Sequence, residues 1–264
     1  TFEGKIFLTS LQQLEKNPSL AKLKEFHLKF PLVDLKNAET QTFLNTIGSI
    51  FEKIAQITVL HLHLRNTSYE SFYLQKLVSC TSLKSLNLLI DYPTSNEEFV
   101  SYFKMISNLE ELIILSVQYQ PMGFLGPDWS RKACKETNSC LKKLTQLASV
   151  EFSFPTVPFG VYFSFLQGCE SIRILKLTIH SYIIDSAAIS TFRKSMKSLK
   201  GLRNLYLLGD DCFLFISYEQ YLEIAEILKQ KRLSELHLEW PYRTEEDEQD
   251  WDLVKNEIIK SLVV

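Results

Sequence analysis

The sequence predicts an α/β fold: a curved solenoid, or horseshoe, with parallel strands on its concave face and helices on its convex face. Three observations favour this fold. One apolar pattern recurs eight times in the 264 residues, the segments between several copies show helical periodicity, and Gly and Pro occur only eight times each. So few turn-forming residues argue against a plain β-sandwich, whereas strands that alternate with helical segments are typical of parallel sheets.

Each copy of the pattern contains four apolar residues, separated in turn by two, two and one other residues. From Leu23 to Leu233 the second of these positions recurs in seven steps, with a mean period of 30 residues. Self-similarity at such a period is typical of repeat arrays. Gln230 is the one polar residue at a patterned position. The copies are Leu20-Leu23-Phe26-Leu28, Ile54-Ile57-Leu60-Leu62, Cys80-Leu83-Leu86-Leu88, Leu109-Leu112-Leu115-Val117, Leu144-Leu147-Val150-Phe152, Cys169-Ile172-Leu175-Leu177, Leu199-Leu202-Leu205-Leu207 and Gln230-Leu233-Leu236-Leu238.

Segments such as LKSLNL, LRNLYL and LSELHL resemble the L-x-x-L-x-L core of leucine-rich repeats, over roughly residues 20–240. The long repeats make the chain most similar to the ribonuclease-inhibitor-like class, which is intracellular and has a helix in each repeat. The family motif continues with Asn or Cys three residues after the last Leu. The resemblance is to an irregular member of the family, because none of the residues at this position is Asn or Cys: they are Pro31, Arg65, Asp91, Gln120, Pro155, His180, Asp210 and Pro241. It implies a function in protein–protein recognition.

Three intervening segments show helical patterns. Residues 95–106 begin with Ser95, a plausible cap, followed by two acidic residues that suit the first turn of a helix. Apolar residues then recur at helical spacing, as they also do in residues 40–54 and 217–229. Each unit is therefore expected to be a short strand plus a helix.

The whole chain, residues 1–264, is predicted to be one domain, because stacked units bury a continuous core that no single unit can bury alone. Residues 1–19 are expected to form an N-terminal cap or a partial repeat, and residues 20–240 the repeats. Residues 241–264 combine an acidic run with an amphipathic stretch and are expected to form a C-terminal capping helix. An acidic docking tail is the alternative for this last segment.

Composition narrows the possible partners and the compartment. The net charge is −2, so the chain lacks the overall basic character of most nucleic-acid-binding proteins, and no nucleic acid is expected as a partner. No apolar stretch approaches about 18 residues, so no membrane insertion is expected. An odd number of cysteines without clustered spacing favours a reducing, intracellular and cytoplasmic location; they are Cys80, Cys134, Cys140, Cys169 and Cys212. Cys80 and Cys169 occupy a patterned position and are expected to be small core residues.

Because side chains alternate along a strand, the residues beside each patterned strand position are expected on the concave face. Their mixture of apolar and polar types suits a protein surface, and acidic residues outnumber basic ones, which disfavours a phosphate backbone. The predicted partner-binding residues on this face are His27, His61, His63, Leu89, Ile114, Glu151, Ile174, Lys176, Tyr206 and His237.

The histidines of the concave face have a second interpretation. His61 and His63 point to one side of one predicted strand, and His27 is expected beside His61 on the next. Two strand histidines plus a third form a geometry that zinc can use, with Glu25 as a fourth ligand or a supporting partner. Ordinary polar surface histidines are the favoured interpretation, so the sequence predicts no metal site, and His27, His61 and His63 are the candidates if one exists.

The longest repeat contains a separate candidate surface. Residues 120–129 include two Gly and two Pro, which indicates a loop. Its apolar residues are expected either to fold back over the helices or to form an exposed anchor for a partner. They are Met122, Phe124, Leu125 and Trp129.

No catalytic motif is present: phosphate-binding loops, G-x-G-x-x-G, H-E-x-x-H, C-x-x-C and G-x-S-x-G are all absent. The sequence therefore predicts a non-enzymatic interaction or scaffolding module without a cofactor, whose partner is another protein. It could serve as a structural subunit of a larger intracellular assembly. Two alternatives stay open: a metal-binding protein or metal-dependent hydrolase that uses the concave-face histidines, and the substrate-recognition part of a ubiquitin-ligase adaptor.

Overall fold

The computed structural model describes residues 2–29, 37–65, 75–91, 95–120, 130–154, 157–179, 184–209 and 218–239. Strands and helices alternate along these residues. The elements are α1 (Phe2–Glu15), η1 (Pro18–Lys22), β1 (Glu25–Lys29), α2 (Asn37–Lys53), β2 (Val59–Arg65), η2 (Leu77–Ser79), β3 (Ser85–Asp91), α4 (Asn96–Ile106), β4 (Ile114–Gln120), α5 (Arg131–Lys143), β5 (Ser149–Phe154), α6 (Phe159–Leu166), β6 (Ile174–Ile179), α7 (Ser186–Ser198), β7 (Asn204–Gly209), α8 (Tyr218–Lys229) and β8 (Glu235–Glu239).

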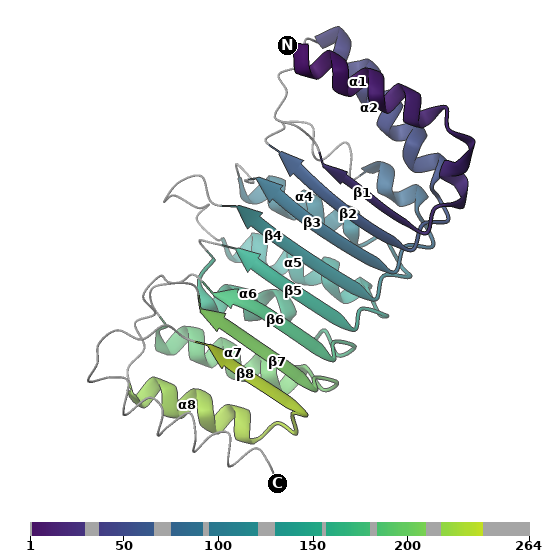
Figure 1. Cartoon of the computed structure of the whole chain (residues 1–264). Coiled ribbons are helices and arrows are strands. Elements are labelled where there is room, and N and C mark those ends of the chain that lie inside the picture. Colours follow the sequence, from purple (N-terminus) through teal and green to yellow (C-terminus); the bar gives the residue numbers. More distant parts are fainter. Residues whose placement is uncertain are drawn as a thin grey trace.

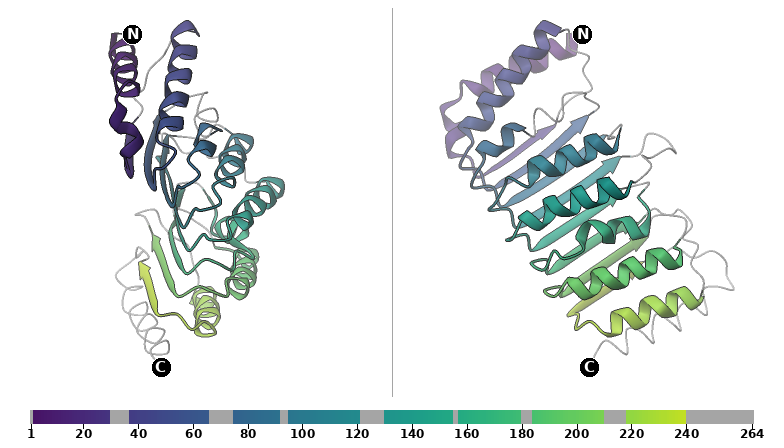
Figure 2. Two further views of the ribbon diagram at one scale, coloured as in Figure 1. Left: turned by 90° about the vertical axis from the view of Figure 1, so that its right-hand side faces the viewer. Right: turned by 180° about the vertical axis from the view of Figure 1, so that it is seen from behind.

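The eight strands form one parallel sheet whose spatial order is the order of the sequence, β1 to β8 (Figure 1). Among the described residues each strand pairs only with its neighbours in sequence and β1 does not pair with β8, so the sheet is open rather than closed. The helices α2 and α4 to α8 lie on one face of the sheet (Figure 2). The predicted α/β arrangement of parallel strands alternating with helices is therefore confirmed. We call the face of the sheet opposite these helices the open face.

The first two patterned residues of a repeat close a hydrogen-bonded turn. In seven repeats the backbone N–H of the second donates to the C=O of the first, as from Leu23 to Leu20 at 3.1 Å and from Ile57 to Ile54 at 2.8 Å. This bond explains the spacing of three. The eighth repeat, in which Gln230 replaces the apolar residue, has no such bond among its described residues, and Lys231 N–H donates to Leu228 O instead.

A ladder of backbone hydrogen bonds joins neighbouring repeats just before their strands begin. The C=O of the residue that precedes one strand accepts two N–H groups from the next repeat, as Lys24 O does from Thr58 and Val59 at 2.9 and 3.0 Å. All seven steps between neighbouring strands show this arrangement, which we call the entry ladder. Its acceptors are Lys24, Thr58, Lys84, Ile113, Ala148, Arg173 and Arg203.

The predicted helices are found within a few residues of their expected ends. α4 begins after Ser95, whose side-chain oxygen accepts from Glu98 N–H at 3.2 Å, which confirms the predicted cap. The segments 40–54 and 217–229 correspond to α2 and α8. Between β2 and β3 the description begins with two α-helical residues, Gln75 and Lys76, which the short 3-10 helix η2 follows. α1 lies beside α2 at the N-terminal end of the array (Figure 1), which is compatible with the predicted cap.

One buried cluster runs between sheet and helices, from Leu11 in α1 to Leu238 in β8. Nearly all patterned residues belong to it, and Cys80 and Cys169 are 0% and 4% exposed, so they are core residues as predicted. Its centre is aromatic: Phe99 packs at ring-centroid distances of 4.9 to 5.7 Å against four other rings. This cluster joins the sheet to the helices along the whole array.

Gly201 lies where two successive turns approach closely, and replacing it with alanine is expected to destabilise the fold. A Cβ there would lie 2.7 Å from Glu170 O and 3.3 Å from Ile172 O, both of them backbone atoms that cannot move aside alone. We expect Gly201→Ala to lower the free energy of unfolding by about 1–3 kcal/mol, the usual cost of overpacking. Urea denaturation followed by circular dichroism measures this change.

Gly48→Ala is the matched control. Gly48 lies inside α2, and its added Cβ would meet only the flexible side chain of Lys76, at 3.2 Å. Alanine in a helix interior is better than glycine by roughly 0.5–1 kcal/mol, so this variant should be as stable as the parent or more stable. Equal destabilisation by both substitutions would contradict the close approach at Gly201.

Candidate functional site

The strand register places three rows of side chains across the open face. The parallel pairing is in step from β1 to β8, so equivalent residues of all eight strands lie side by side. The first row is Glu25, Val59, Ser85, Ile114, Ser149, Ile174, Asn204 and Glu235. The middle row is His27, His61, Asn87, Ser116, Glu151, Lys176, Tyr206 and His237. The third row is Lys29, His63, Leu89, Gln118, Ser153, Thr178, Leu208 and Glu239.

All ten residues predicted to bind a partner from the strands lie in these rows, but they do not form one patch. Five of them surround a hollow at the C-terminal end of the sheet: Glu151, Ile174, Lys176, Tyr206 and His237. His27 and His61 lie at the opposite end, on β1 and β2. His63, Leu89 and Ile114 lie outside that hollow, on β2 to β4.

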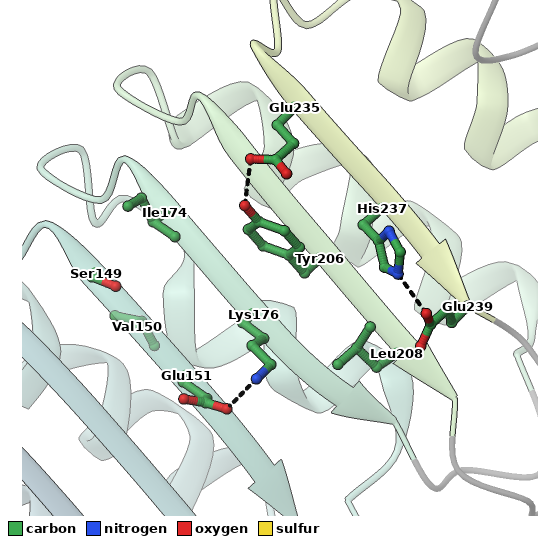
Figure 3. Close-up of a pocket in the computed structure, with 10 residues that line it drawn as sticks. All are labelled: Ser149, Val150, Glu151, Ile174, Lys176, Tyr206, Leu208, Glu235, His237 and Glu239. Carbon is green, nitrogen blue, oxygen red and sulfur yellow. Dashed lines mark hydrogen bonds and ion pairs between the residues drawn. The ribbon is translucent and has the colours of Figure 1, made fainter.

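The hollow crosses β5 to β8 and has a volume of about 550 Å³ (Figure 3). We call it the β5–β8 groove. Five further residues line it that were not among the predicted partner-binding residues: Ser149, Val150, Leu208, Glu235 and Glu239. Four of them were predicted to be on the same face, and each lies two residues along its strand from a predicted partner-binding residue: Ser149 from Glu151, Leu208 from Tyr206, and Glu235 and Glu239 from His237.

The β5–β8 groove contains both apolar and carboxylate side chains. Ile174 is 41% exposed, which is high for a large aliphatic residue in a central strand, and Tyr206 and Leu208 on β7 are half-buried. Figure 3 shows Ile174 and Tyr206 on neighbouring strands, with Glu235 beyond them on β8. The groove therefore combines an apolar floor with a carboxylate rim.

The charged groups of the groove are not evenly paired. Lys176 Nζ lies 2.8 Å from Glu151 Oε1, so these two charges offset each other (Figure 3). Glu235 instead accepts hydrogen bonds from two neutral donors, the Tyr206 hydroxyl and the Asn204 amide, the latter at 2.7 Å. Glu239 Oε1 lies 2.6 Å from His237 Nε2. The β8 side of the groove is thus its acidic side.

The other end of the open face gathers a different set of side chains. Glu25, His27 and His61 bring one potential metal-ligating atom each within 4.8 Å of one another. Among the described residues this is the one group of three or more that meets this distance. His63 is not part of it, although the sequence named it as a candidate with His27 and His61. The reason is the strand repeat: successive residues on one side of a strand lie about 6.6 Å apart, so His63 faces Lys29 rather than His27.

The cysteines are poorly suited to redox chemistry. Burial raises the pKa of the Cys80 and Cys169 thiols to about 12, with Lys142 slightly opposing this change at Cys169. Burial also raises the pKa of Cys134 and Cys140. The thiolate is the reactive form, so these four thiols are held in the inert one. All four are free, and Cys212 lies outside the described residues.

Two predicted features cannot be followed in the structure. The loop residues Met122, Phe124, Leu125 and Trp129 lie outside the described residues, and so does the C-terminal segment 241–264. Within the part of the chain that is described, none of the helices combines the length and the apolar character that crossing a bilayer requires.

Comparisons with known proteins give no family. No protein-family model matches the sequence, and no curated protein matches it either. Among solved structures the chain is similar to the C-terminal domain of tropomodulin from Caenorhabditis elegans, with 15% identity and a TM-score of 0.40, over 62% of this chain and 92% of that one. It is also similar to a sugar phosphate isomerase/epimerase from Parabacteroides distasonis, with 11% identity and a TM-score of 0.26, over 91% and 94% of the two chains. Neither likeness bears on function, which has to be argued from the chain's own residues.

Proposed function

We propose that this chain is a non-enzymatic protein-interaction module, built as an irregular leucine-rich-repeat solenoid of the ribonuclease-inhibitor-like class. Its binding surface is the β5–β8 groove, and the occupant is an extended segment of another protein with basic and aliphatic side chains. The single observation that carries the proposal is that one groove contains both the exposed apolar side chain of Ile174 and the carboxylates of Glu235 and Glu239.

The solenoid class is supported by the nearest-neighbour order of the strands and by the repeated turn. A closed barrel would require β8 to pair with β1, whereas these strands are the two edges of the sheet. The mean period of 30 residues and the seven turns between the first two patterned positions also fit a leucine-rich repeat. An open array of this kind offers an extended surface rather than an enclosed pocket.

The shape of the groove favours an extended segment. Its lining side chains come from four parallel strands, in rows that repeat about every 4.8 Å from strand to strand. A chain lying obliquely across the strands meets Ile174 and then its diagonal neighbour Tyr206, and each offers apolar area to an aliphatic side chain. Aromatic residues in such positions commonly dominate the energy of an interface.

The charge of the groove favours a basic occupant. Glu151 already has Lys176 as its cation, whereas Glu235 is held by neutral donors. An arginine or lysine of the partner can therefore add a charge-assisted hydrogen bond at Glu235 without displacing an existing ion pair. Such complementarity contributes mainly to specificity and to the rate of association.

The test is a selection of random displayed peptides on the full chain, followed by affinity measurements on the enriched sequences. We expect enrichment of peptides that combine Lys or Arg with aliphatic residues, and binding that weakens as salt is raised. Ile174→Asp should weaken binding at least about tenfold, or roughly 1.4 kcal/mol, because it places a charge on the apolar floor.

Val78→Asp is the matched control for this experiment. Val78 lies in η2, away from the groove, and is 43% exposed, close to the 41% of Ile174. This variant should bind the selected peptides as the parent does. Enrichment of acidic or uncharged peptides, or equal loss of binding in both variants, would overturn the proposed site.

A further inference from the structure

We infer that Glu25, His27 and His61 form a binding site for a divalent transition-metal ion of the zinc class, at the β1–β2 end of the open face. This site is separate from the β5–β8 groove and does not depend on the function proposed for that groove. It differs from the histidine set suggested by the sequence, because Glu25 replaces His63 as the third ligand.

The position of the three ligands follows from the strand register. Glu25 and His27 are two residues apart on β1, so both side chains leave the sheet on the same side. His61 on β2 is the register partner of His27. Three potential ligands are thereby held on two paired strands, a more rigid support than a loop provides.

The distances suit a small metal ion. Glu25 Oε1 lies 2.7 Å from His27 Nε2 and 3.7 Å from His61 Nε2. Bonds of about 2.0–2.2 Å at a tetrahedral centre place neighbouring ligand atoms about 3.3 Å apart, and the two observed distances lie on either side of this value. Two imidazoles and one carboxylate are a known zinc ligand set, and they leave the fourth position for water.

Metal binding requires a small rotation of the two rings. The His27 and His61 rings are stacked, with centroids 4.1 Å apart and planes inclined by 9°. A metal lies in the plane of the imidazole that binds it, so two nearly parallel rings must turn toward a common point. Exposed fractions of 64% for the His27 side chain and 37% for that of His61 leave room for this turn. Loss of the stack is therefore a direct signature of binding.

The opposite edge of the same sheet provides an internal comparison. His237 and Glu239 on β8 also form a histidine–glutamate pair two residues apart, with Nε2 and Oε1 2.6 Å from each other. The register partner of His237 on β7 is Tyr206, where the β1–β2 site has a second imidazole. The two edge strands thus provide one such pair with a third ligand beside it and one without.

The experiment is titration of the full chain, without a polyhistidine tag, with Zn²⁺ by calorimetry and with Co²⁺ by visible spectroscopy. We expect one ion per chain, a Co²⁺ spectrum without thiolate bands, and shifts in the imidazole NMR signals of His27 and His61. Affinity should fall as the pH is lowered, because protons compete for the imidazole nitrogens.

Two variants distinguish the proposed site from nonspecific binding of Zn²⁺ elsewhere on the surface. His61→Asn should lower the affinity for Zn²⁺ by more than the 10–100-fold that is typical for loss of an outer-shell partner. His237→Asn should leave both stoichiometry and affinity unchanged, while circular dichroism confirms that both variants are folded. Absence of saturable binding, a thiolate band, or equal loss in the two variants would overturn the site. None of these results would affect the peptide-binding test, which is carried out without metal.

Discussion

Replacing Phe99 with alanine is expected to lower the free energy of unfolding by about 3–5 kcal/mol, the largest change among the substitutions considered. Phe99 is fully buried in α4, and its ring lies 4.9 Å from that of Phe103, 5.7 Å from Tyr119 and 5.5 Å from Phe154 and Phe165. These neighbours belong to α4, β4, β5 and α6, so the cavity would be shared by three successive repeats. Urea denaturation followed by circular dichroism measures the loss.

Leu222→Ala in α8 is the control for this cavity. Leu222 is 39% exposed, and truncating it should change the free energy of unfolding by no more than about 0.5 kcal/mol. If the Phe99 variant lost less than about 1 kcal/mol, Phe99 could not occupy the centre of the aromatic core, and the packing of α4 against β4 and β5 would be wrong.

The second large effect is expected from Tyr162→Phe, which removes one buried hydroxyl and fills the same volume. That hydroxyl accepts from Phe154 N–H at 2.8 Å, and it lies within donating distance of Phe154 O at 3.0 Å and Thr178 O at 2.9 Å. Without it, backbone groups of β5 and β6 lose their partner in the core. We expect the free energy of unfolding to fall by about 1–3 kcal/mol.

Tyr206→Phe is the matched control, because it removes a hydroxyl on the open face, where water can replace the lost bond to Glu235. The free energy of unfolding of this variant should stay within about 0.5 kcal/mol of the parent. Similar losses in both tyrosine variants would contradict the special role of the buried hydroxyl.

The Tyr162 hydroxyl also makes the stability depend on alkaline pH. Burial raises the pKa of Tyr162 above its ordinary value of 10.0, and the hydrogen bond with the Phe154 backbone opposes this only in part. The unfolded chain therefore loses this proton first, so the stabilisation is complete below about pH 10 and is lost as the pH rises further. In Tyr162→Phe this contribution is absent, and the decline between about pH 10 and 11 should be shallower than in the parent.

The strands were predictable because each patterned residue serves the same core. The side chains of Leu86 and Leu88 point toward the helices, which places Asn87 on the open face, and the same parity holds from β1 to β8. The cap at Ser95 was predictable for a similar reason, since both the cap and the apolar stripe that follows it are local. Local chemistry and a strict period thus define the elements and the face on which each side chain lies.

The composition of the candidate sites was less predictable. The register follows from the apolar pattern and places His27 beside His61, as predicted. Which third side chain lies close to these two histidines also depends on side-chain torsions, which the periodicity does not encode. The β5–β8 groove likewise depends on how the side chains of four neighbouring strands pack beside one another, which the apolar pattern does not describe.

The entry ladder has a consequence for how this array can diversify. Its seven acceptors are main-chain carbonyls, and the residues that supply them are Lys24, Thr58, Lys84, Ile113, Ala148, Arg173 and Arg203. Basic, polar, aliphatic and small residues thus provide the same bond, because every residue type has a backbone C=O. Substitutions at these seven positions therefore leave the hydrogen bonds of the entry ladder available, and the strands can keep their register. A sequence can then drift far from any motif defined by side chains and still keep its architecture.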